Sequence, residues 1–292
     1  MKQLLILSGK GGTGKTTVAG AFIKISQAKA YADCDVDAPN LHLLMSQHVN
    51  PEQKDFYGLD KAIINQESCA ACGLCAQYCR FDAIQKNGKV YQVDSFACEG
   101  CGLCDEICPV KAISMTPCVV GNLKMYKAKD VFSTAQLKMG NGNSGLLVSE
   151  VKKQMKNNKP ENTHLAVIDG SPGIGCPVIA SLSGVDMVLI VTEPSLSGMS
   201  DLDRIVKTTH KLQVKPAVCI NKYDTNQQIS NKIKDYCEKE GILFTGMIPY
   251  DNMVIKAVNQ GRSIMDYECE AREAIKKVYQ NTIKHIELTE EK

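Results

Sequence analysis

The sequence has no large excess of either charge, no long apolar run and no recognisable export signal. Its 292 residues include 34 lysine and arginine and 32 aspartate and glutamate residues, which gives a net charge of +2. A balanced charge offers no electrostatic reason to expect binding to nucleic acid or to an acidic membrane surface. No apolar stretch approaches the ~20 residues that a membrane-spanning helix needs, and the N-terminus lacks the pattern of a signal peptide. We therefore expect a cytoplasmic protein without a nucleic-acid or membrane partner.

A glycine-rich segment near the N-terminus carries the most informative motif. Residues 9–16 read GKGGTGKT and fit the phosphate-loop pattern G-x-x-x-x-G-K-S/T at every required position. An apolar run of strand length precedes the segment, and apolar residues at helical spacing follow it. A loop between a strand and a helix turns its backbone N–H groups toward an anion at the positive end of the helix. The residues expected to bind nucleotide phosphates are Gly11, Gly12, Thr13, Gly14, Lys15, Thr16 and Thr17.

Two of these side chains, and three carboxylates that follow, have more particular predicted roles. Lys15 is expected to reach the β- and γ-phosphates, and the Thr16 hydroxyl is expected to bind Mg²⁺. Asp33, Asp35 and Asp37 follow a short predicted strand, and the carboxyl end of a strand in an α/β sheet is where ligands bind. Carboxylates there are suited to hold water around Mg²⁺ or to orient an attacking water. A solvated acidic turn is the alternative interpretation, and residue type alone does not separate the three aspartates.

Cysteine is unusually frequent, because the chain has 14 and eight of them lie between positions 69 and 108. These eight form two C-x-x-C-x-x-C-x-x-x-C runs, and the second run follows the first with a period of 29 residues. The spacing is similar to that of bacterial two-cluster ferredoxins, in which the fourth cysteine of each run ligates the other cluster. Two four-cysteine zinc sites are the alternative. The predicted ligand sets are Cys69, Cys72, Cys75 and Cys108 for one [4Fe-4S] cluster, and Cys98, Cys101, Cys104 and Cys79 for the other.

The glycine-rich loop and the first acidic segment together resemble a known ATPase family. A second lysine, Lys10, stands near the start of the loop, and the pair Asp33-x-Asp35 follows it along the chain. This pattern is similar to that of the MinD/ParA/Mrp superfamily of deviant P-loop ATPases, to which the nitrogenase iron protein is related. The resemblance implies that Lys10 reaches the phosphates of a partner subunit across a nucleotide-sandwich dimer, and that Asp35 orients the attacking water. It also implies a homodimer, or a heterodimer with a related ATPase.

A second candidate acidic residue ends a buried strand predicted over residues 164–169. The strand ends in Asp169, and the segment Asp-Gly-Ser-Pro-Gly that begins there resembles the switch II segment of the same family. The resemblance implies that Asp169 holds Mg²⁺ through water and that the backbone amide of Gly173 senses the γ-phosphate. A simple strand-to-helix turn would explain the glycines but not the acid at the end of the strand.

Alternation of strands and helices predicts the fold. It favours an α/β P-loop NTPase with a mostly parallel sheet and helices on both faces, interrupted by a small inserted α+β domain of bacterial ferredoxin type. We expect the ATPase domain at residues 1–56 and 117–292 and the inserted two-cluster ferredoxin domain at 57–116. Within 117–140 we expect two short strands separated by a turn. The acidic end from residue 287 lacks the basic amphipathic helix that MinD uses at membranes.

The nucleotide base is left open between adenine and guanine. The segment Asn221-Lys222-Tyr223-Asp224 matches the guanine-reading pattern Asn-Lys-x-Asp of GTPases. In the MinD relatives the asparagine at this strand end binds adenine, and a downstream loop, here with Pro249 and Asp251, packs against the base. Because Lys10 and the switch segment carry the family resemblance, ATP is the favoured nucleotide and GTP is the alternative.

Three functions fit these motifs. The first is an ATPase that couples nucleotide-driven dimerisation to electron transfer through two [4Fe-4S] clusters, with a redox partner protein. The second is an ATP-dependent assembly or carrier protein for iron–sulfur or metal cofactors, with a cofactor acceptor as its partner. The third is a positioning protein of the MinD/ParA kind with a redox sensor. Cys118 and Cys176 are candidates for an additional metal centre, although inert buried thiols are the favoured interpretation.

Overall fold

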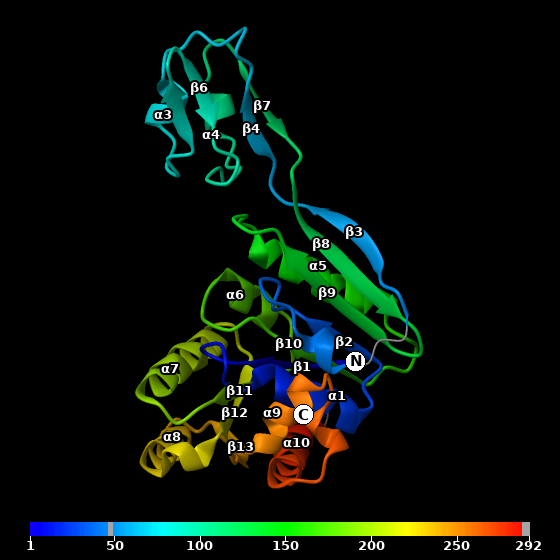
Figure 1. Ribbon diagram of the computed structural model, residues 1–292. Coiled ribbons are helices and arrows are strands. Elements are labelled where there is room, and N and C mark those ends of the chain that lie inside the picture. Colours follow the sequence, from blue (N-terminus) through cyan, green and yellow to red (C-terminus); the bar gives the residue numbers. More distant parts are fainter. Residues whose placement is uncertain (46–48, 288–292) are drawn as a thin grey trace.

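The computed structural model describes residues 1–45 and 49–287, so the last residues of the acidic C-terminal end lie outside the described part. Nine strands form its main sheet (Figure 1). In chain order they are β1 (Lys2–Leu7), β2 (Ala30–Asp33), β3 (Glu52–Tyr57), β8 (Val119–Lys127), β9 (Val131–Leu137), β10 (Leu165–Asp169), β11 (Met187–Thr192), β12 (Lys215–Asn221) and β13 (Leu243–Ile248).

The sheet is mostly parallel, as the alternating pattern predicts. Its spatial order is β13-β12-β11-β1-β10-β2-β9-β8-β3. Every neighbouring pair from β13 to β9 is parallel, whereas β8 runs antiparallel to β9 and β3 runs antiparallel to β8. Strands β1, β10 and β2 lie side by side in the middle, so the loops after their carboxyl ends gather at one edge of the sheet.

Helices cover both faces of the sheet, which confirms the expected α/β architecture. They are α1 (Lys15–Ser26), α2 (Leu41–Leu44), α5 (Ser144–Asn158), α6 (Cys176–Leu182), α7 (Leu196–Lys211), α8 (Gln227–Lys239), α9 (Asn252–Asn259) and α10 (Glu270–Glu287). Apolar side chains of α5, α6, α7 and α8 pack into one core beneath the sheet. Those of α1, α9 and α10 pack into a second core on the opposite face. No helix in the described ranges is long and apolar enough to cross a membrane.

The cysteine-rich segment forms a small separate unit at one end of the molecule (Figure 1). The chain leaves the main sheet at the end of β3 and returns at the start of β8. Between them β4 (Lys61–Ile64) pairs with β7 (Ile113–Thr116), and β5 (Ile84–Asn87) pairs with β6 (Val90–Val93). Two short helices, α3 (Leu74–Gln77) and α4 (Leu103–Glu106), complete the unit, which has its own small apolar core.

The segment 117–140 differs from the expectation of two short strands with a turn between them. It is a hairpin of two long strands, and both expected short strands, with the residues between them, lie inside β8. A Cβ atom on Gly121 would come within 3.0 Å of the Gln136 carbonyl oxygen and of the Leu147 side chain on α5. The glycine therefore allows α5 to approach the sheet closely, and it does not mark a turn.

Helix α7 begins at Leu196, earlier than the regular apolar periodicity of its sequence alone would place it. The hydroxyl of Ser195 accepts a hydrogen bond from the backbone N–H of Gly198 at 3.0 Å and caps the helix. Serine is among the preferred residues at this position because its oxygen satisfies an otherwise unpaired N–H group. The apolar periodicity becomes regular only after this first turn, so the pattern alone gives a later start.

Candidate nucleotide site and cysteine cavities

The predicted phosphate loop joins the end of β1 to the first residue of α1. Gly12 and Gly14 have backbone φ angles of +80° and +90°, a left-handed region that favours glycine. The loop borders a cavity of about 690 Å³ that it shares with the acidic segment after β2 and the segment after β10. The buried Thr13 hydroxyl oxygen has no hydrogen-bond partner in the part of the chain that the structure describes. A loop at a helix N-terminus that carries an unpaired hydroxyl donor is suited to bind a phosphate.

Lys15, the predicted phosphate-binding lysine, is almost fully buried and faces two carboxylates. Its Nζ lies 2.6 Å from Asp169 Oδ1 and 3.8 Å from Asp35 Oδ2. Burial lowers the pKa of Lys15, but the charge of Asp169 and its hydrogen bond raise the pKa above the ordinary value. Lys15 is therefore a charged ammonium that balances the acidic cluster.

The three aspartates Asp33, Asp35 and Asp37 have different surroundings in the structure, which their residue type alone does not reveal. Asp33 is fully buried, and its two carboxylate oxygens accept hydrogen bonds from the backbone N–H groups of Asp35 and Leu41 at 3.0 and 2.9 Å. Asp35 and Asp37 line the cavity instead. Burial, followed by the charge of Asp169, raises the pKa of Asp33 to about 7. Burial also raises the pKa of Asp35, to about 6. Asp33 thus shapes the loop that presents Asp35.

Asp169 and Gly173 flank Ser171 and Pro172, which line the same cavity, although neither of the two lines it directly. Asp169 is fully buried, and its Oδ2 atom has no hydrogen-bond partner among the described residues. A carboxylate oxygen in this position, next to Lys15, can accept a hydrogen bond from a water molecule bound to Mg²⁺. Gly173 has a φ angle of +98°, and its N–H donates to the Ser8 carbonyl at 3.0 Å. The amide expected to sense the γ-phosphate therefore bonds to the phosphate loop in this structure.

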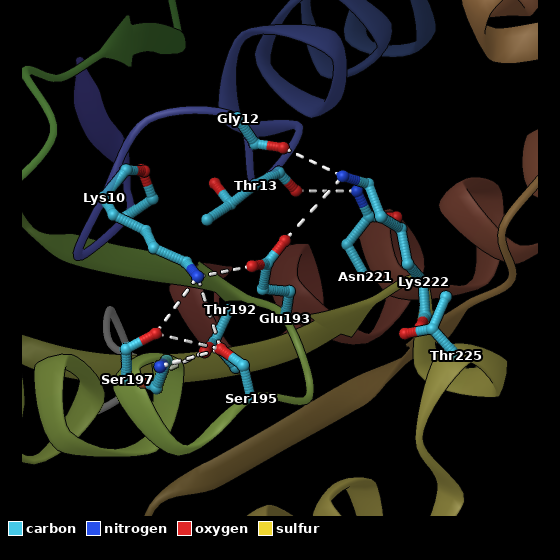
Figure 2. A network of polar contacts seen from close by, with 12 residues as sticks. Lys10, Gly12, Thr13, Thr192, Glu193, Ser195, Ser197, Asn221, Lys222 and Thr225 are labelled. Carbon is cyan, nitrogen blue, oxygen red and sulfur yellow. Dashed lines mark hydrogen bonds and ion pairs between the residues drawn. The ribbon is translucent and has the colours of Figure 1, made fainter.

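Lys10 has partners that the sequence does not reveal. Its Nζ lies 2.5 Å from Glu193 Oε1 and donates to the hydroxyls of Ser195 at 3.3 Å and Ser197 at 3.1 Å. All three belong to the segment from the end of β11 to the start of α7 (Figure 2). Lys10 also borders the cavity beside the phosphate loop, which we call the nucleotide cavity. Lys10 therefore lies between the segment after β11 and this cavity.

The predicted base-contact residues lie at the same end of the sheet but do not line this cavity. Asn221 Nδ2 donates to the Thr13 carbonyl at 2.7 Å (Figure 2). Asp224 Oδ1 accepts from the Tyr250 N–H at 2.7 Å and so holds the segment that contains Pro249. Asp251 caps α9, where it accepts from Met253 N–H at 2.8 Å. In this structure these side chains support the loops, and their contacts with a base stay predictions.

The eight clustered cysteines surround two cavities in the small unit. Gly73 and Gly102, with φ angles of +82° and +76°, precede α3 and α4 at equivalent positions of the two repeats. Within the described residues, no three His, Cys, Asp or Glu side chains are arranged to hold a single metal ion. One cavity is lined by Cys69, Cys72, Cys75 and Cys108, and the other by Cys75, Cys79, Cys98, Cys101 and Cys104.

Cys118 and Cys176, the candidates for an additional centre, lie outside both of these cavities. Cys118 is half-buried at the start of β8 and packs against the core of the main sheet. Cys176 is exposed at the first residue of α6, and its backbone and side chain border Gly145. A metal site that uses either cysteine stays a prediction.

A mostly parallel sheet, a glycine-rich loop before a helix and buried acids at neighbouring strand ends define a P-loop nucleotide-binding protein. The chain belongs to the CobQ/CobB/MinD/ParA nucleotide-binding domain family, whose model matches residues 4–264. This membership confirms the expected MinD/ParA class, and the protein is a P-loop ATPase.

Relatives and solved structures agree with this assignment. An uncharacterized protein of Methanocaldococcus jannaschii is 29% identical over 285 residues, with 95% of each chain covered. An iron-sulfur cluster carrier protein of Pyrococcus horikoshii is 23% identical, over 91% of this chain and 80% of the relative. The cell division ATPase MinD of Pyrococcus furiosus superposes with a TM-score of 0.55 at 16% identity, over 97% of this chain and 98% of the other. The last similarity concerns the fold alone.

Proposed function

We propose that this protein couples ATP-driven dimerisation to electron transfer through two [4Fe-4S] clusters held in the cysteine-rich unit. The observation that carries the proposal is the set of cysteines around each of the two cavities. Cys108 of the second repeat lines the cavity of the first, and Cys79 of the first repeat lines the cavity of the second. This exchange is the ligand pattern of two-cluster ferredoxins.

The residues around the cavities suit iron–sulfur clusters better than zinc. Four thiolates hold a cubane cluster, and each thiolate binds a different iron. Four thiolates around such a cluster are farther apart than four thiolates around one zinc ion, and within the described residues no three His, Cys, Asp or Glu side chains are arranged to hold a single metal ion. Clusters held here would supply one-electron chemistry, while the protein would set their exposure and spacing.

The nucleotide cavity supplies the residues for ATP binding and hydrolysis. Lys15 and the loop amides would hold the phosphates, and Thr16 with Asp169 would hold Mg²⁺ and its water shell. Asp35 lines the cavity at the position where a carboxylate can orient an attacking water. Lys10 would contribute to the phosphate site of a dimer, formed with a second copy or with a related ATPase.

Contacts between the two parts of the molecule support coupling. The side-chain oxygen of Asn143 accepts a hydrogen bond from the Leu59 N–H at 3.4 Å, at the entrance to the small unit. A Cβ atom on Gly142 would lie 2.5 Å from the carboxylate of Glu99, which borders the second cysteine cavity. The next glycine, Gly145, packs against Cys176 after the switch segment. The loop at 140–145 thus contacts both a cysteine cavity and the switch region.

Iron and sulfide analysis of anaerobically purified protein tests this proposal. We expect about eight iron and eight sulfide per chain, with the broad visible absorption of thiolate-bound clusters. A matched preparation of Cys118→Ser should keep the full iron content, because Cys118 lines neither cavity. About two zinc per chain without visible charge-transfer absorption would instead establish the zinc alternative.

An ATP-dependent carrier of iron–sulfur or metal cofactors is the second candidate function. It is favoured by the iron-sulfur cluster carrier proteins of two Pyrococcus species, which are 23% and 24% identical to this chain. An exposed thiol, Cys176, next to the switch segment offers a ligand that ATP hydrolysis could expose or withdraw. Transfer of iron to an apo-acceptor that requires ATP and leaves the two built-in clusters intact would support this function over electron transfer.

A further inference from the structure

Lys10 is fully engaged by the segment between β11 and α7 (Figure 2). Its ammonium lies 2.5 Å from Glu193 Oε1, 3.3 Å from the Ser195 hydroxyl and 3.1 Å from the Ser197 hydroxyl. A lysine ammonium has three protons to donate, and these three oxygens account for them. Lys10 therefore binds a phosphate only if it gives up at least one of these partners.

Glu193 itself pairs with two lysines, Lys10 within the phosphate loop and Lys222 after β12. Its Oε2 lies 3.7 Å from Nζ of Lys222, and the same Nζ donates to the Gly12 carbonyl at 2.9 Å (Figure 2). The Glu193 side chain is 23% exposed, so solvent screens its charge only in part. A single carboxylate thus links the start of the loop, through Lys10, to its middle, through Lys222.

We propose that Glu193 is a positioning residue of the ATPase reaction, because its carboxylate restrains Lys10 and competes with phosphate for that ammonium. Lys10 borders the nucleotide cavity, where a bound triphosphate would bring negative oxygens within reach of the loop. The phosphate that replaces Glu193 belongs either to the nucleotide of the same chain or to that of a second copy. The proposal rests on the ATPase activity and does not depend on the cysteine clusters.

The substitution Glu193→Gln tests this restraint because it removes the negative charge but keeps the size of the side chain. Lys10 then meets phosphate in both the ground state and the transition state, so KM for ATP should fall with little change in kcat. We expect a decrease of about two- to fivefold, the size of a partly exposed ion pair. Steady-state ATP hydrolysis at several protein concentrations provides the measurement.

The dependence on protein concentration separates the two sources of phosphate. If Lys10 binds the nucleotide of its own chain, the decrease in KM is the same at every protein concentration. If it binds the nucleotide of a second copy, Glu193→Gln lowers the protein concentration that gives half-maximal specific activity. Either result supports a restraint by Glu193.

A double-mutant cycle with Lys10→Ala distinguishes positioning from a structural effect. In the Lys10→Ala background, Glu193→Gln should leave both KM and the half-maximal protein concentration unchanged. Glu150→Gln is the matched control, because it breaks a surface pair with Lys153 on α5 at a distance from the site. The proposal is wrong if Glu193→Gln raises KM or leaves both quantities unchanged, or if its effect persists in the Lys10→Ala background.

Discussion

Replacing Lys15 by alanine should weaken the binding of ATP by about 10- to 100-fold, the loss expected when a charge-assisted hydrogen bond to a phosphate is removed. Lys15 is the first residue of α1, directly after the glycine-rich loop, and its ammonium pairs with Asp169 at 2.6 Å. Isothermal titration calorimetry or a fluorescent nucleotide gives the dissociation constant directly. Unchanged affinity in Lys15→Ala would show that the cavity described above does not hold the phosphates.

The same substitution should also lower stability, because it removes the positive partner of buried carboxylates. Breaking a buried ion pair from one side typically costs about 3–5 kcal/mol, and Lys15 is only 6% exposed. The double variant Lys15→Ala/Asp169→Asn removes one of the stranded negative charges. It should recover part of the lost melting temperature without recovering nucleotide affinity, which separates phosphate binding from folding.

Replacing Cys79 by serine should remove about half of the bound iron, from the cluster whose other ligands belong to the second repeat. Cys79 belongs to the first repeat by sequence but lines the cavity of Cys98, Cys101 and Cys104. Iron analysis together with EPR of the reduced protein measures both the amount and the identity of the remaining cluster. Loss of the cluster bound by Cys69 and its neighbours, with the other retained, would contradict the exchange of ligands between repeats.

Replacing Cys108 by serine provides the matched counterpart to Cys79. Cys108 belongs to the second repeat but lines the cavity of the first. Its loss should therefore remove the other half of the iron and leave the EPR signal that Cys79→Ser abolishes. The two variants together identify each cluster by its spectrum.

Features encoded in short stretches of sequence could be predicted. The phosphate loop is one example, because Gly12 and Gly14 are required by local backbone conformation and Lys15 by the motif itself. The alternating strands and helices gave the parallel sheet and its two covered faces, since hydrophobic periodicity is a local property. The carboxyl ends of the strands then bring Asp35 and Asp169 next to Lys15 of the loop.

Features that depend on distant contacts could not be predicted. Glu193 and Lys10 follow neighbouring strands, β11 and β1, and no spacing in the sequence relates the two positions. The role of Gly121, which allows the close approach of α5, exists only in the packed structure. Similarly, Asp33 and Asp35 have the same residue type, and only backbone hydrogen bonds assign a structural role to the first.

Potentiometric titration followed by EPR, with and without ATP, tests most directly whether the nucleotide site and the clusters are coupled. The cavity lined by Cys98 and Cys101 adjoins Glu99, which contacts the loop at 140–145, whereas the other cavity does not include that residue. ATP should therefore shift the midpoint potential of the second-repeat cluster by tens of millivolts, where about 59 mV corresponds to a tenfold coupling for one electron. The first-repeat cluster should shift less, and Lys15→Ala should abolish both shifts. Identical potentials of both clusters in the presence and absence of ATP would contradict coupling between ATP hydrolysis and electron transfer.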